Sequence, residues 1–136
     1  MNRPILLAYQ VLIGLSDTLT GAMLIIAPEF TLRLMGLRAA SGSLPYLSFI
    51  GAFVLSVGLA CLYGALVMAR RGSPHALEMV WLLTAFTRAS VAVLVVTQIL
   101  AQTLEPAWLT VAISDGACVL IQATGLRKGW LGNVAR

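Results

Sequence analysis

The sequence predicts an all-α integral membrane protein, a four-helix bundle with a short interfacial helix between the first and second spans. Of its 136 residues, 60% are hydrophobic and only 10% are charged, whereas a soluble domain carries roughly 25% charged residues. The mean hydropathy is +0.94, which excludes disorder and argues against a soluble enzyme. A helical span needs about 20 residues, so a chain of this length accommodates roughly four spans. We expect a single transmembrane domain over residues 1–136.

The boundaries of the spans follow from proline, glycine and charged residues. Pro4 suits the first turn of a helix, where its missing N–H costs nothing. Pro45 opens the second span, a basic turn at 70–74 separates it from the third, and Glu105 precedes the fourth. A β-barrel would need many alternating strands, so helices are predicted throughout. The expected spans are residues 4–27, 46–69, 76–103 and 107–126.

The loop between the first two spans has an amphipathic pattern of its own. Phe30, Leu34 and Leu37 recur at helical spacing, and Glu29 and Arg33 are polar. This pattern predicts a short helix lying in the outer interface. Four aromatic residues near span ends are expected to act as interfacial anchors, namely Tyr46, Trp81, Trp108 and Trp130.

The distribution of basic residues predicts the orientation. Six Lys/Arg residues lie at the N-terminus, in the loop at 70–74 and at the C-terminus, whereas two lie in the loops on the other side. By the positive-inside rule we expect both termini to be cytoplasmic. We also expect a bacterial inner membrane as the location and a retained span in the N-terminal apolar run. Since no basic patch is interleaved with aromatic residues, lipid is expected as the partner of these charges, and nucleic acid is not.

Three charged residues lie inside the apolar runs. Asp17, Arg88 and Asp115 each fall near the middle of a different span, so all three are expected near the bilayer midplane. A charge at that depth costs about 2.5–3.5 kcal/mol on insertion scales. An arginine can bridge two carboxylates, so we predict one Asp17–Arg88–Asp115 cluster. Its expected polar neighbours are Thr20, Thr84, Cys118 and Gln122.

Two interpretations of this cluster remain open. It is either an assembly device that fixes which helix faces point inward, or a functional site. In the second case the two carboxylates and one guanidinium sum to −1, so one carboxyl would hold a proton and carry it across the membrane.

Small and sulfur-containing residues mark packing positions. Ser56, Ala60 and Gly64 form a small-residue ridge in the second span, as do Gly51 and Gly58. Cys61 and Cys118 are expected to be small packed residues at a shared depth, with a redox pair or a Cu(I) site as the outside alternative. The chain has one histidine and no CxxC motif, so we expect no metal and no cofactor.

The chain resembles the DoxX-like group of small four-span bacterial membrane proteins. The resemblance rests on Ala27-Pro28-Glu29, on Met35-Gly36-Leu37, on the glycine-rich run at 51–64, and on Arg88 and Asp115 inside the third and fourth spans. It implies a four-helix membrane bundle, sometimes associated with redox or stress-related partners, with no common activity. Asp17 has no counterpart in that pattern.

A second resemblance is to small multidrug resistance transporters, which also have four spans and an acidic residue in the first, as Asp17 is here. The aromatic residues expected around their drug site are missing from the matching places of the second and third spans, and Arg88 would repel cationic drugs.

The sequence thus favours a non-enzymatic accessory or scaffold subunit of a larger membrane assembly, bound to other membrane subunits or to itself. The loops are too short for a catalytic domain, and no nucleophile and base are paired. The alternative is a small proton-coupled transporter that uses Asp17 and Asp115.

Overall fold

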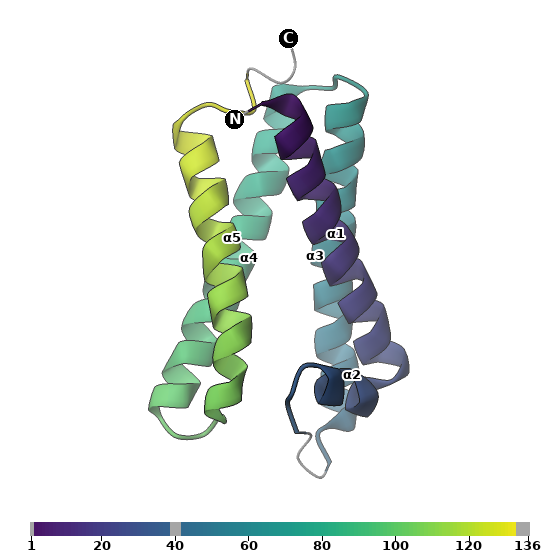
Figure 1. The fold of residues 1–136 in the computed structure, drawn as a ribbon, viewed down its shortest axis with the longest axis vertical. Coiled ribbons are helices and arrows are strands. Elements are labelled where there is room, and N and C mark those ends of the chain that lie inside the picture. The colour runs from purple at the N-terminus through teal and green to yellow at the C-terminus, as the bar shows by residue number, and fades with distance from the viewer. Residues whose placement is uncertain (1, 39–41, 133–136) are drawn as a thin grey trace. The chain divides into compact units, whose positions relative to one another are not determined.

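The computed structural model describes residues 2–38 and 42–132, and these residues form helices and turns without a β-strand. Four helices are long and apolar enough to cross a membrane, judged by length and composition. The all-α class and the four candidate spans are therefore confirmed. In chain order (Figure 1), the elements are α1 (Arg3–Ile26), α2 (Pro28–Leu34), α3 (Leu44–Ala69), α4 (Pro74–Leu100), the 3-10 turn η1 (Pro106–Trp108) and α5 (Leu109–Arg127).

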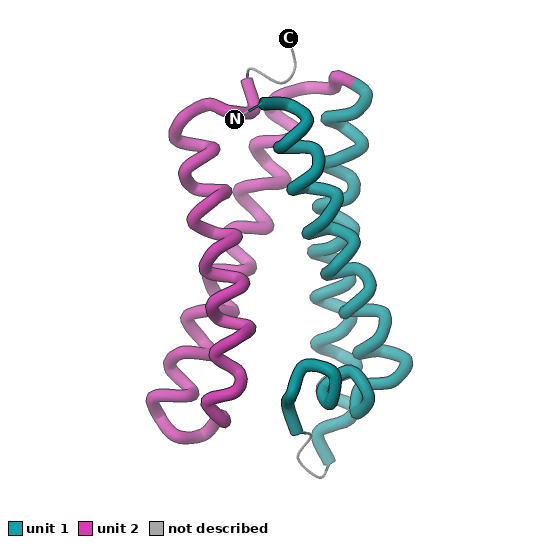
Figure 2. Tube along the Cα trace, in the orientation of Figure 1, with its two compact units in different colours: residues 1–70 teal, residues 71–136 magenta. Residues whose placement is uncertain are grey.

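The chain divides into two compact units, residues 1–70 and 71–136 (Figure 2). The first unit pairs α1 with α3 and carries α2, and the second pairs α4 with α5. Each unit is a hairpin of two long antiparallel helices (Figure 1). The single domain and the assembly of both hairpins into one bundle stay predictions. Arg136, which contributes to the inner basic charge, lies outside the described residues.

Proline opens most of the helices, as the sequence indicates, and a residue in the left-handed conformation follows the end of four of them, α2 to α5. At the end of α4, Gln102 has φ +58°. The Gln102 N–H donates to the Ile99 carbonyl and the Thr103 N–H to the Gln98 carbonyl, both at 3.0 Å, which is the Schellman pattern. The expected end at residue 103 was therefore wrong by three residues, because the residue that ends the helix is not the usual glycine.

The first unit is held together by glycines that bring two backbones close. A Cβ atom added to Gly21 would overlap the backbone nitrogen of Leu55, and one added to Gly58 would overlap that of Thr18. Gly51, which is also buried, lies against Leu24. The Gly51 and Gly58 ridge expected in the second span is thus the face that contacts α1, where small residues allow close helix approach in lipid. The other ridge is divided, since Gly64 is buried and Ser56 is exposed.

The short helix expected between the first two spans is present as α2. It buries Leu32 and exposes Phe30 and Leu34. It ends at Leu34. Gly36, two residues later, has φ +73°, and the Leu37 N–H donates to the Leu32 carbonyl at 2.8 Å. Glycine tolerates this left-handed conformation, and the buried Leu37 then packs back on the unit.

The second unit is closed by tryptophan at one end. Trp81 is fully buried, and a Cβ atom added to Gly125 would overlap its ring and lie 2.8 Å from that of Trp130. The prediction that Trp81 is an interfacial anchor was therefore wrong. Gly125 has no side chain, so it leaves the space into which the indole packs.

Candidate intramembrane polar site

Arg88 and Asp115 form a buried ion pair between α4 and α5. Arg88 Nη1 donates to Asp115 Oδ1 at 2.6 Å, and the two side chains are 7% and 14% exposed. Arg88 lies near the middle of α4, so the helix itself places the guanidinium far from both ends of the candidate span. The pairing expected between these two residues is confirmed. A charged hydrogen bond of this length offsets much of the cost of placing either charge in an apolar span.

A second polar contact joins the same two helices, one turn from Arg88 on α4 and two turns from Asp115 on α5. Gln122 Nε2 donates to Thr84 Oγ1 at 2.9 Å, and the Thr84 hydroxyl donates to the Val80 carbonyl at 2.7 Å. Gln122 is fully buried and Thr84 is 3% exposed. Two of the neighbours expected from the sequence, Thr84 and Gln122, thus contact one another.

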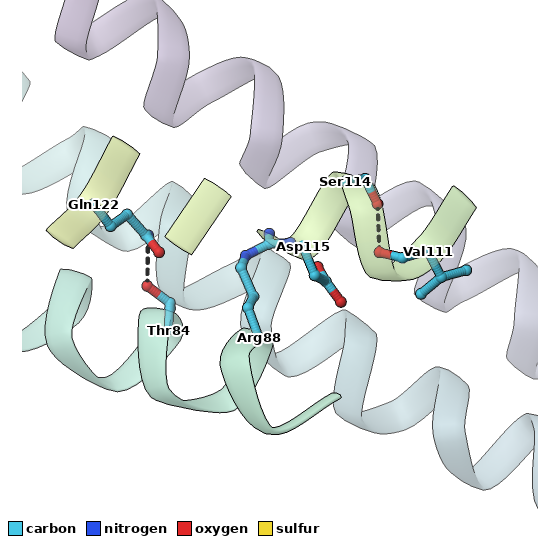
Figure 3. A network of polar contacts seen from close by, with 6 residues as sticks. All are labelled: Thr84, Arg88, Val111, Ser114, Asp115 and Gln122. Carbon is cyan, nitrogen blue, oxygen red and sulfur yellow. Dashed lines mark hydrogen bonds and ion pairs between the residues drawn. The ribbon is translucent and has the colours of Figure 1, made fainter. Parts of the chain in front are cut away.

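These four residues, Thr84, Arg88, Asp115 and Gln122, form what we call the polar seam (Figure 3). Thr84 and Arg88 are one helical turn apart on α4, and Asp115 and Gln122 are two turns apart on α5, so each pair shares a helix face. Cys118 is buried on α5, three residues after Asp115. The seam explains why two apolar helices keep one register, because any rotation would separate both contacts.

One acceptor of the polar seam has no hydrogen-bond donor among the residues that the structure describes. It is Gln122 Oε1, which is buried. A buried amide oxygen without a donor is costly, and more so in a bilayer, where bulk water does not replace the lost partner. The Gln122 side chain donates to Thr84 through its nitrogen, so its oxygen is the acceptor of the polar seam that is left to pair.

Asp17 and Thr20 lie on α1 in the first unit, and both are half-buried. Their contact with the Arg88–Asp115 pair stays a prediction, and so does the common depth of Cys61 and Cys118. Both cysteines are buried, Cys61 on α3 and Cys118 on α5.

Sequence reasoning missed a cap that joins the two ends of the first unit. Arg3 Nη2 donates to the carbonyls of Met68 and Ala69 at 3.0 and 3.1 Å. These carbonyls are in the last turn of α3, where helix geometry leaves acceptors unpaired and the dipole favours a cation. The positive-inside rule counts Arg3 only as one more basic residue at the N-terminus. Nothing in the sequence therefore indicates that Arg3 caps the end of α3.

The geometry offers charge neutralisation and hydrogen bonding inside the second unit. Across residues 2–38 and 42–132, no three His, Cys, Asp or Glu side chains are grouped to hold a metal ion. The hydroxyls of Ser114 and Ser90 donate to backbone carbonyls of their own helices (Figure 3 for Ser114). Serines bonded in this way suit an apolar environment and are not poised as nucleophiles.

Comparisons with protein-family models, with curated proteins and with solved structures find no match to this chain.

Proposed function

We propose that this chain is a non-enzymatic accessory or scaffold subunit of a larger membrane assembly, in which the Arg88–Asp115 pair fixes how its helices pack. The observation that carries the proposal is the pairing itself. Both charged groups are largely buried, and they bond to one another at 2.6 Å. A charged residue that holds two membrane helices in register is expected to be buried and paired with an opposite charge on the neighbouring helix.

The proposal includes a bacterial inner-membrane location with both termini in the cytoplasm. The six-to-two bias of Lys and Arg between the two sets of loops supports this orientation. It also includes membership of the DoxX-like group, supported by the Arg88 and Asp115 positions and by α2 between the first two long helices. The partners would be lipid and other membrane subunits, or further copies of the chain.

A proton-coupled carrier is the second candidate, and a specific observation favours it. Asp115 keeps 14% of its side chain exposed, and the buried Gln122 Oε1 has no donor within the described residues. Carboxyl groups inside membrane spans often belong to proton relays.

One experiment separates the two candidates. The full chain is reconstituted in liposomes with an internal pH-sensitive dye, as the wild type, as Arg127→Met, and as the triple variant Asp17→Leu, Arg88→Met, Asp115→Leu. Arg127 ends α5 and is exposed, so its variant controls for the loss of one cation. For a scaffold we expect no proton flux from any of the three proteins.

The same three proteins are then extracted from native membranes in a mild detergent and sized on non-denaturing gels. For a scaffold we expect the triple variant to migrate in the same large assembly as the wild type, because an apolar replacement of all charged partners preserves packing. Proton flux by the wild type, lost in a folded triple variant, would establish the carrier instead. Migration of the wild type as a bare monomer would contradict the accessory role.

A further inference from the structure

The first unit has a hollow beside α2 that the polar seam does not involve. It has a volume of about 350 Å³ and is lined by Ala27, Pro28, Glu29, Phe30, Arg33 and Leu44. These residues come from the end of α1, from α2 and from the first residue of α3. Because α1 and α3 are candidate spans and α2 joins their ends, the hollow lies at the level of the lipid headgroups.

The hollow contains one charge of each sign. Arg33 Nη2 and Glu29 Oε1 are 2.5 Å apart, and the two side chains are 73% and 58% exposed. Both charged groups therefore keep donors and acceptors available to a ligand. Arg38, the other cation of this loop, is exposed and does not line the hollow.

Apolar side chains surround this ion pair. Phe30 and Leu44 line the hollow and are 56% and 40% exposed. Leu34 is 64% exposed one turn after Phe30. An apolar rim beside two opposite charges at the edge of a membrane matches a molecule with a zwitterionic headgroup and acyl chains.

We propose that this hollow binds the headgroup of phosphatidylethanolamine, with Glu29 accepting hydrogen bonds from the ammonium and Arg33 donating to the phosphate. Glu29 then exchanges the guanidinium of Arg33 for the ammonium, and Arg33 exchanges the carboxylate of Glu29 for the phosphate. Each new partner has the charge of the one it replaces, so the charge balance is unchanged. Charged hydrogen bonds of this kind are directional and strong. Phosphatidylglycerol has no cation for Glu29, and phosphatidylcholine has no N–H to donate to it.

The proposal predicts how the wild type discriminates among lipids. The full chain is incubated with equal amounts of phosphatidylethanolamine, its mono- and dimethyl forms, and phosphatidylcholine, and the lipids retained are counted by native mass spectrometry. We expect retention to fall stepwise as N–H groups are replaced by methyls, by about five-fold over the series, since the ammonium loses its charge-assisted hydrogen bonds. Equal retention across the series would overturn the proposal.

Variants assign the two ends of the headgroup. Glu29→Gln should bring retention of phosphatidylethanolamine down to that of phosphatidylglycerol, because only the phosphate contact with Arg33 remains. Arg33→Gln should lower the retention of both lipids. Arg38→Gln is the matched control, and we expect it to behave as the wild type; an equal loss in this variant would show general charge attraction and overturn the site.

A soluble competitor distinguishes a lipid from a free headgroup. Glycerophosphoethanolamine has the same charged groups without acyl chains, so it should displace the retained lipid poorly at equal concentration. Full displacement would overturn the assignment of a lipid to the hollow. This inference is independent of the scaffold proposal, because neither Glu29 nor Arg33 belongs to the polar seam.

Discussion

Trp81 of α4 fills the space that a side chain at Gly125 of α5 would need. Trp81 is fully buried, so its ring has no open direction in which to move. Together the two residues set how closely α4 and α5 approach one another. They lie beyond Thr84 and Gln122, at the end of the polar seam away from Arg88.

Gly125→Ala should therefore destabilise the second unit. Alanine favours a helix over glycine by about 1 kcal/mol, but the overlap with the Trp81 ring opposes this gain and costs about 1–3 kcal/mol. We expect a lower midpoint of thermal unfolding in detergent and a shifted tryptophan emission. Gly116→Ala is the control, because a Cβ atom there meets nothing within 4 Å, and it should stabilise. A Gly125→Ala variant as stable as Gly116→Ala would contradict the close packing of Trp81.

Gly21→Ala in α1 should have a larger effect than Gly125→Ala. The atoms in the way belong to the backbone of Leu55, and the added Cβ would also lie 2.8 Å from the Gly51 carbonyl oxygen. Backbone atoms cannot relieve the overlap by a rotamer change as a side chain can. The helices α1 and α3 must therefore separate, at a cost of about 3 kcal/mol or more. Unfolding by a denaturing detergent, followed by circular dichroism, measures the loss. Equal stability of Gly21→Ala and Gly116→Ala would rule out this helix contact.

Composition and charge were sufficient to predict the fold class, because 60% hydrophobic content in four runs leaves few alternatives. The Arg88–Asp115 pair was predictable for a related reason. A charge inside a span has few tolerable environments, and the nearest one is an opposite charge at the same depth. Helix periodicity placed Thr84 on the face of Arg88 and Gln122 on the face of Asp115, but it did not predict that Thr84 and Gln122 contact one another.

The positions that sequence reasoning missed depend on pairwise fit. Trp81 near a span end satisfies the pattern of an interfacial anchor, and only the facing Gly125 shows that its ring is buried. Gln102 takes a left-handed conformation that glycine adopts more readily, so the end of α4 carried no glycine to mark it. The cap by Arg3 on the end of α3 spans 65 residues of sequence, a separation over which no local pattern acts.

Gln102→Gly should stabilise the turn after α4. Gln102 has φ +58°, a conformation that costs a residue with a Cβ atom about 1 kcal/mol or more relative to glycine. The gain should appear as a higher unfolding midpoint. Ala101→Gly is the matched control, since Ala101 has φ −76°; this change should destabilise, because it adds only freedom to the unfolded chain. If both variants shift the unfolding midpoint in the same direction, the shift in Gln102→Gly is not caused by relief of backbone strain at Gln102.

The orientation predicted from the basic residues can be tested with single cysteines. Cys61 and Cys118 are buried and are first replaced by alanine. Cysteine is then placed at Asn2 or Ser73, on the side predicted to be cytoplasmic, and at Arg38 on the other side. In intact cells a membrane-impermeant maleimide should label only the Arg38 position, and the other two only after the cells are broken. Labelling of the Asn2 and Ser73 positions in intact cells would reverse the orientation.

Removing Arg88 tests whether Asp17 completes the cluster. Arg88→Met leaves Asp115 buried without its partner, which should cost about 3–5 kcal/mol and reduce the folded protein recovered from membranes. If Asp115 were the only partner, adding Asp115→Leu would restore stability. The predicted Asp17–Arg88–Asp115 cluster gives a different result. The double variant still leaves Asp17 uncompensated, so stability should return only in the triple variant with Asp17→Leu.

The three variants are compared by thermal unfolding and by yield, with Arg127→Met as the control for losing a cation at an exposed position. We expect Arg127→Met to match the wild type within about 0.5 kcal/mol, as surface changes usually do. Asp17→Leu alone should destabilise less than Asp115→Leu alone, because Arg88 keeps its 2.6 Å contact with Asp115. Full recovery in the double variant would limit the cluster to the pair within the second unit, and α1 would then be held by its glycine contacts with α3 without help from Arg88.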